Sequence, residues 1–204
     1  MSIVWLRHGE TALNATRVVQ PADMPLSDRG LRQAAAAARR LAALSPVALL
    51  SSDMPRAAQT AQAVAAATGL PVHTEPLLRE RNFGQLRGRT HDSLGFELRT
   101  LREAPPGGES MAEFLTRVAR AWHRVVAHRA NLDGPLIVIS HGLLIHAALR
   151  DHAEWQDSAT VPPWLENTAV SVVDAAAPHR VRQVNCTAHL NDGADGPCAS
   201  NAIV

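Results

Sequence analysis

Five residues in this sequence could together perform chemistry on a negatively charged group. Arg7 and His8 follow the first short apolar run of the chain, and His141 follows the fourth. Arg56 and Glu80 lie in the segments after the second and third runs. The guanidinium group of arginine can donate two parallel hydrogen bonds to a tetrahedral oxyanion. A neutral histidine has a ring nitrogen with which it can attack phosphorus. These residue types therefore predict a phosphate site with a histidine nucleophile.

Both histidines are candidates for the nucleophile. Whichever of His8 and His141 does not attack would stabilise the oxygens of a loose phosphoryl-transfer transition state. Nearby arginines disfavour protonation of a histidine and so keep it nucleophilic near neutral pH. Helices are predicted to begin near Arg56 and at Gly142, and the free amides of a helix amino terminus add fixed dipoles for an anion.

The elements that must position these residues alternate between short apolar runs and helical patterns. This alternation predicts an α/β fold with three α/β/α layers and a mostly parallel central sheet. The last two runs are separated by only six residues, 175–180, and predict an antiparallel hairpin at the edge of the sheet. The predicted strands are 3–6, 48–51, 72–74, 136–140, 170–174 and 181–185.

Four helices are marked by their termini. Ser27 is a plausible N-cap for the first, and Pro55 and Gly69 bound the second. The string "SMAE" from Ser110 is a capping box that opens the third helix, and the fourth begins at Gly142. In open sheets of this kind ligands bind beyond the carboxyl ends of the strands, where all five candidate residues are predicted to lie.

Composition predicts one globular domain over residues 1–190 and a flexible tail over 191–204. The chain has 204 residues, of which 46% are hydrophobic and 19% charged. A net charge of +1 gives no reason to expect nucleic acid or an acidic membrane as partner. The apolar run before Arg7 is too short for a signal peptide or a membrane span, and Cys186 and Cys198 are expected to be free thiols, so a cytoplasmic location is expected.

The motifs resemble one known family. The strings "LRHGETALN", "LSDRGLRQA", "SSDMPRAAQTA", "LRERNFGQLRG", "GGESMAEF", "ISHG" and "ENTAVSVV" occur in this order between residues 3 and 190. Together they resemble the histidine phosphatase superfamily, the phosphoglycerate mutase-like proteins. The resemblance implies the α/β/α fold of that family and an enzyme of the histidine acid phosphatase type, a phosphoric monoester hydrolase, acting on a small phosphorylated metabolite without a cofactor or metal.

The resemblance also implies a role for each candidate residue. His8 would be phosphorylated, Arg7 and Arg56 would clamp the phosphoryl oxygens, His141 would complete the pocket and Glu80 would donate the proton. Two further polar residues fall where the family contacts the phosphate or the rim of the substrate, Asn14 and Gln20. The sequence departs from the family at Pro21, where glycine is frequent, so the shape of this rim loop is left open.

Three functions remain possible on these residues. A phosphohistidine can pass its phosphoryl group to water, as in a phosphatase, or to a bound sugar acid, as in a cofactor-dependent phosphoglycerate mutase. The mutases of this family carry a long insertion that closes over the substrate. The corresponding segment of this chain, residues 80–109, is short, which favours the phosphatase. The third possibility is a non-catalytic phosphate-binding module, which would need the arginines but not His8 and Glu80.

Other residues have structural interpretations beside functional ones. Glu80 could simply pair with the neighbouring Arg79, Arg81 and Arg87, the last two of which are rim residues at most. Trp155 and Trp164 flank a proline pair, and either could line a pocket. A structural role is expected for the remaining histidines: His73, His91, His123, His128, His146, His152, His179 and His189.

Overall fold

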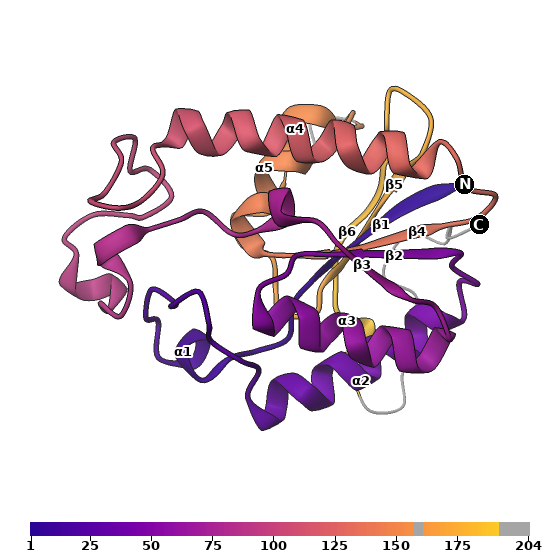
Figure 1. The fold of residues 1–204 in the computed structure, drawn as a ribbon, viewed down its shortest axis with the longest axis horizontal. Helices are drawn as coiled ribbons and strands as arrows, with labels where there is room; N and C mark the ends of the chain where they lie inside the picture. Colours follow the sequence, from indigo (N-terminus) through magenta and orange to yellow (C-terminus); the bar gives the residue numbers. More distant parts are fainter. Residues whose placement is uncertain (157–160, 192–204) are drawn as a thin grey trace.

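A computed structural model describes residues 1–156 and 161–191, and its centre is one six-stranded sheet (Figure 1). The strand order is β3-β2-β4-β1-β5-β6. All six predicted strands are present, and they differ from the prediction by at most one residue at either end. Their bounds are β1 Ser2–Arg7, β2 Ala48–Ser51, β3 Val72–Thr74, β4 Leu136–Ser140, β5 Val170–Asp174 and β6 Val181–Cys186.

The sheet is mostly parallel, as predicted. Strands β1, β2, β3 and β4 pair in parallel, whereas β5 is antiparallel to both β1 and β6. The last two strands therefore form the predicted antiparallel hairpin, with β6 at the edge. In the register of β1 and β4, Arg7 lies opposite Ser140. The residues that follow these two strands, His8 and His141, consequently emerge side by side.

Helices cover both faces of the sheet and complete the three layers. In Figure 1, α4 (Met111–Arg129) and α5 (Gly142–His152) lie above the sheet, and α2 (Asp28–Ala42) and α3 (Pro55–Thr68) lie below it. A single-turn helix, α1 (Ala12–Ala15), follows β1.

The predicted caps are in place. The Ser27 hydroxyl accepts a hydrogen bond from the Gly30 amide, and Ser110 and Glu113 form the capping box of α4. Gly69 ends α3 with φ of 75°, in the left-handed region.

Two hydrophobic clusters hold the layers together. Along β1, Ile3 and Trp5 face the cluster built with α4 and α5, whereas Val4 and Leu6 face the cluster built with α2 and α3. Because β1 is buried on both faces, its sequence is continuously apolar rather than alternating. This two-sided packing fixes the end of β1, from which Arg7 and His8 continue.

Close backbone packing shapes the turn after β1. A Cβ atom at Gly9 would lie 2.5 Å from the Gly30 carbonyl oxygen, and one at Gly30 would lie 2.0 Å from the Glu10 carbonyl oxygen. Only glycine permits this approach, which presses the turn after His8 against the start of α2.

The expectation for the cysteines is wrong at Cys186, which is disulfide-bonded rather than a free thiol. Cys198 and the predicted flexible tail, apart from Asn191, lie outside the described residues. Within residues 1–156 and 161–191, none of the helices combines the length and the apolar character that crossing a membrane requires.

Candidate active site

A cleft of about 470 Å³ opens beyond the carboxyl ends of β1, β2 and β4. Seven of the eight predicted site residues line it: Arg7, His8, Asn14, Gln20, Arg56, Glu80 and Gly142. The eighth, His141, is fully buried directly behind the cleft, with its ring centroid 5.1 Å from that of His8. A larger hollow of about 800 Å³ at the other end of the sheet contains none of the predicted residues.

His8 is held by hydrogen bonds to its backbone and to one ring nitrogen. Its amide donates to the Ser140 carbonyl over 3.0 Å, and its carbonyl accepts from the Asn167 side chain over 3.1 Å. The ring nitrogen Nδ1 lies 2.7 Å from the Gly9 carbonyl oxygen. A carbonyl oxygen only accepts, so Nδ1 carries the proton and Nε2 has a free lone pair.

The surroundings keep His8 uncharged. Its side chain is only 3% exposed, and burial lowers its pKa well below the usual 6.5. The positive charges of Arg56 and Arg7 lower this pKa further, while the hydrogen bond to the Gly9 carbonyl opposes the shift. His8 is therefore a neutral imidazole at neutral pH, with Nε2 available as a nucleophile.

His141 lies at the N-cap position of α5, immediately after β4. Its Nε2 is 2.8 Å from the hydroxyl oxygen of Ser52, and its Nδ1 is buried without a hydrogen-bond partner among the described residues. Burial lowers its pKa well below 6.5, and the charges of Arg56 and Arg7 add to the shift. Ser52 was not predicted, because a single hydroxyl after β2 gives no sequence signal of its own.

The two arginines retain hydrogen-bond donors that the protein does not use. Arg7 donates to the Leu165 carbonyl through Nη1, and Arg56 donates to the Pro21 carbonyl over 3.4 Å. The Nε atoms of both arginines are buried and lack a partner within the described residues. Guanidinium donors that the protein leaves unused can bind the oxygens of an anion, so the two arginines are suited to that role.

Burial also lowers the pKa values of both guanidinium groups, that of Arg56 to about 10. The charge of Glu80 opposes the shift in each case. Both groups remain charged at neutral pH. The contact of Arg56 with the Pro21 carbonyl places the rim loop, whose shape the sequence left open, against this arginine.

The amino terminus of α5 meets the clamp at Gly142. A Cβ atom at this position would lie 3.4 Å from Nε of Arg7, so glycine lets the helix end approach the guanidinium closely. No hydrogen bond occupies the Gly142 amide in the described part of the chain, whereas the next two amides, those of Leu143 and Leu144, are bound by Glu80. The Gly142 amide therefore adds a free donor at the site.

The carboxylate of Glu80 caps α5 rather than forming an ion pair. Oε2 accepts from the Leu143 amide over 3.0 Å, and Oε1 accepts from the amides of Leu144 and Arg81 over 3.2 and 3.0 Å. Two of the arginines that might have neutralised it are engaged elsewhere: Arg79 pairs with Asp53, and the Arg81 side chain binds backbone carbonyls. Glu80 therefore faces the cleft with its carboxylate held by backbone amides.

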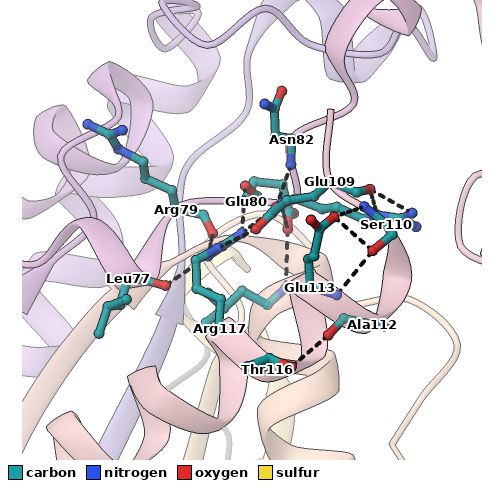
Figure 2. A network of polar contacts seen from close by, with 12 residues as sticks. Leu77, Arg79, Glu80, Asn82, Glu109, Ser110, Ala112, Glu113, Thr116 and Arg117 are labelled. Carbon is teal, nitrogen blue, oxygen red and sulfur yellow. Dashed lines mark hydrogen bonds and ion pairs between the residues drawn. The ribbon is translucent and has the colours of Figure 1, made fainter. Parts of the chain in front are cut away.

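A network beneath Glu80 fixes the segment that carries it (Figure 2). Arg117 on α4 donates to both carboxylate oxygens of Glu109 over 2.7 and 2.8 Å. It also donates to the carbonyls of Leu77, Arg79 and Glu80 over 2.8, 2.7 and 3.2 Å. One side chain thus ties the Glu80 backbone both to α4 and to the end of the loop formed by residues 81–109.

Asn14 and Gln20 also line the cleft and share Thr11 as a partner. The Asn14 side-chain oxygen accepts from the Thr11 amide over 3.1 Å and from the Asn167 side chain over 3.3 Å. The Gln20 side-chain oxygen accepts from the Thr11 hydroxyl over 3.0 Å. Thr11 and Asn167 were not singled out by the sequence analysis, although both lie within strings that carry the family resemblance.

The outer cleft contains residues that the sequence analysis placed elsewhere. Two histidines expected to be structural, His91 and His146, line it. Of the two tryptophans, Trp164 lines the cleft and stacks under the Arg99 guanidinium, 4.0 Å from the ring centroid, whereas the Trp155 indole donates to the Leu149 carbonyl. Arg81 also lines the cleft, but it is only 2% exposed and its guanidinium binds backbone carbonyls of the loop.

The fold and the site define an α/β protein that holds an uncharged histidine beside two buried arginines with unused donors. The profile of the Histidine phosphatase superfamily (branch 1) matches residues 3–187. The chain belongs to this superfamily, as its motifs indicated.

Known proteins similar to this chain include both phosphatases and mutases. A glucosyl-3-phosphoglycerate phosphatase of Mycolicibacterium vanbaalenii is 38% identical over 71% of this chain and 71% of its own. A probable phosphoglycerate mutase, GpmB, of Yersinia pestis is 33% identical over 94% of this chain and 95% of its own. Among solved structures, a mycobacterial glucosyl-3-phosphoglycerate phosphatase in complex with VO3 has 30% identity and a TM-score of 0.71, covering 85% of this chain and 90% of its own.

Proposed function

We propose that this protein is a phosphatase that hydrolyses a small phosphate monoester through a phosphohistidine at His8. One observation carries the proposal: a neutral His8, with Nδ1 bonded and Nε2 free, lies between two arginines that have unused donors. Binding of VO3 by a similar phosphatase is consistent with an anion in the equivalent cleft. The sequence-based prediction of a phosphatase agrees with the family and with these relatives.

The first half of the reaction forms the phosphohistidine. Arg7, Arg56 and the Gly142 amide hold the phosphoryl oxygens, and Nε2 of His8 attacks phosphorus in line with the leaving oxygen. The bond from phosphorus to that oxygen breaks, and a proton from Glu80 converts the departing alkoxide into an alcohol. Oε2 of Glu80 is the more suitable atom to carry that proton, because it accepts one backbone amide whereas Oε1 accepts two.

The second half returns the enzyme to its starting state. The carboxylate of Glu80 takes a proton from a water molecule, whose oxygen attacks phosphorus and breaks the bond to Nε2. Inorganic phosphate leaves, and His8 is again neutral. Throughout, positive charge comes from the arginines and the amide dipoles, so the proposed mechanism requires no metal ion or cofactor.

We favour hydrolysis over mutase activity because of the loop between Glu80 and Glu109. A mutase must hold its intermediate away from water, and this short loop offers little to close over the cleft. The binding-module alternative does not explain why Nε2 of His8 is free and why Glu80 faces the cleft without an ion pair. We also propose acid-phosphatase behaviour, because a His8 with a pKa well below 6.5 stays uncharged in mild acid.

The test uses the purified protein with an aryl phosphate and with 3-phosphoglycerate plus a trace of bisphosphoglycerate, both in excess chelator. Release of inorganic phosphate should be the dominant event and should be undiminished at pH 6. Activity that is lost with chelator and restored by a divalent metal would refute the metal-free mechanism. Conversion of 3-phosphoglycerate to 2-phosphoglycerate without phosphate release would establish the mutase instead.

The physiological setting follows from the substrate class. Phosphate esters are charged and do not cross membranes unaided, so we propose that the enzyme meets its substrate in the cytoplasm. Fractionation of cells that express the protein, followed by detection with an antibody, tests this location.

A further inference from the structure

Arg87 is a cleft arginine whose guanidinium has no partner among the described residues. It ends the 3₁₀ turn Gly84–Leu86, is half-buried and lines the same cleft as His8. Three other arginines of this loop have partners within the protein. Arg81 binds backbone carbonyls, Arg89 donates to the Ser93 carbonyl over 3.1 Å, and Arg99 stacks on Trp164.

The backbone around Arg87 is fixed on both sides. The Gln85 amide donates to the Pro106 carbonyl over 3.0 Å, and the Gly88 amide donates to the Val19 carbonyl over 2.8 Å. Gly84 has a φ of +49°, and a Cβ atom there would lie 2.1 Å from the Pro106 carbonyl oxygen, so this turn depends on glycine. A charged side chain on a fixed backbone is suited to binding, because little order has to be gained when the ligand arrives.

The side chains that line the cleft carry a net positive charge. Six arginines and three glutamates line it, and the histidines among its lining residues all have lowered pKa values, so its formal charge is +3 at neutral pH. A phosphate monoester dianion neutralises two of these charges. Arg87 is close enough to the clamp that its charge, after burial and Arg7, helps to lower the pKa of Arg56.

We propose that Arg87 binds a carboxylate on the leaving-group side of the substrate, so that the enzyme prefers phosphate esters of hydroxy acids. The inference rests on the proposed function and extends it to a substrate class. A carboxylate would give Arg87 the ion-pair partner that it lacks among the described residues, and its two oxygens match the fork of a guanidinium.

The test compares substrates that differ only in the carboxylate. The pairs are 3-phosphoglycerate with glycerol 1-phosphate, and O-phosphoserine with phosphoethanolamine. The carboxylate member should have a kcat/KM higher by about 10- to 100-fold, as one charge-assisted hydrogen bond predicts. Arg87→Gln should bring this ratio close to one. The matched control, Arg89→Gln, changes an exposed arginine outside the cleft lining and should keep the wild-type ratio.

Binding measurements separate this inference from the proposed function. Calorimetric titration of His8→Ala with 3-phosphoglycerate and with glycerol 1-phosphate reports the same preference without turnover, and adding Arg87→Gln should remove it. Equal kcat/KM and equal affinity for both members of a pair would overturn the role of Arg87, even if an aryl phosphate is hydrolysed. An unchanged ratio in Arg87→Gln would overturn it equally. Absence of all hydrolysis, with the binding preference intact, would refute only the proposed function.

Discussion

At the scale of single residues, the proposed reaction requires His8 to stay uncharged beside a phosphate dianion. A phosphate dianion near a histidine favours protonation of the ring, which would abolish its nucleophilicity. Burial and the charges of Arg56 and Arg7 act in the opposite direction, and the Gly9 carbonyl fixes the proton on Nδ1. In the proposed reaction, the same arginines attract the substrate and keep Nε2 free to attack it.

Glu80 should matter only where the leaving group needs a proton. An alkoxide is a poor leaving group unless it is protonated as it departs, whereas nitrophenolate leaves unaided. We expect Glu80→Gln to lower kcat for an alkyl phosphate by about 10²- to 10⁴-fold and to change turnover of p-nitrophenyl phosphate far less. Steady-state kinetics with both substrates checks this. Equal loss on the two substrates would assign Glu80 to the cap of α5 rather than to proton transfer.

At the scale of elements, the strands and caps were predictable and the outer cleft was not. Strands such as β4, buried on both faces, are continuous apolar runs, and capping groups such as Ser110 are local in sequence. The histidine and arginine positions followed because they sit at strand ends. His146 and Trp164 reach the cleft only through the packing of α5 and of loops distant in sequence, and periodicity carries no information about such contacts.

The link between α4 and the Glu80 segment gives an element-scale prediction. Arg117→Gln removes the donor that holds three carbonyls and leaves Glu109 unpaired, with both side chains of the pair largely buried. We expect unfolding free energy to fall by about 1 to 3 kcal/mol. Displacement of Glu80 should also lower alkyl phosphate turnover more than aryl phosphate turnover.

The matched control lies on the exposed side of the same helix. Arg124 pairs with Glu75, but its side chain is 68% exposed, so Arg124→Gln should change stability by less than about 1 kcal/mol. Urea unfolding and the ratio of the two turnover numbers provide the readouts. If Arg117→Gln lowers both activities in proportion, the network stabilises the fold without positioning Glu80.

At the scale of the whole molecule, one sheet brings together loops that are far apart in sequence. All six strands belong to this sheet, and on this basis we propose a single domain for residues 1–190. Its parallel part directs β1, β2 and β4 to the same edge, which lies toward the left of Figure 1. The chemistry of the site thus depends on the packing of both layers of helices.

Holding histidines uncharged in the interior makes stability depend on pH. The pKa values of His8 and His141 are well below 6.5, and burial with the charge of Arg40 lowers that of His189 to about 4. Below about pH 6.5 the unfolded chain binds protons that the folded protein does not, so unfolding free energy should decrease from pH 7 to pH 5.5. Each fully neutral histidine contributes at most about 1.4 kcal/mol per pH unit.

Urea unfolding in phosphate-free buffers across this range measures the effect. His8→Asn removes one such group and should make the decrease shallower by up to that amount. A free energy of unfolding that stays constant between pH 7 and pH 5.5 would show that these histidines take up protons in the folded state, contrary to the environment described for them.

The most direct test of the central claim is chemical trapping of the phosphorylated enzyme. Mixing with radiolabelled phosphate ester and quenching within milliseconds should leave label on the wild-type protein that is stable in base and labile in acid, as expected for a phosphohistidine. The label should be absent from His8→Ala and retained in His73→Ala, which alters an exposed histidine on β3. Label at the wild-type level in His8→Ala would contradict the account and move the nucleophile to another residue.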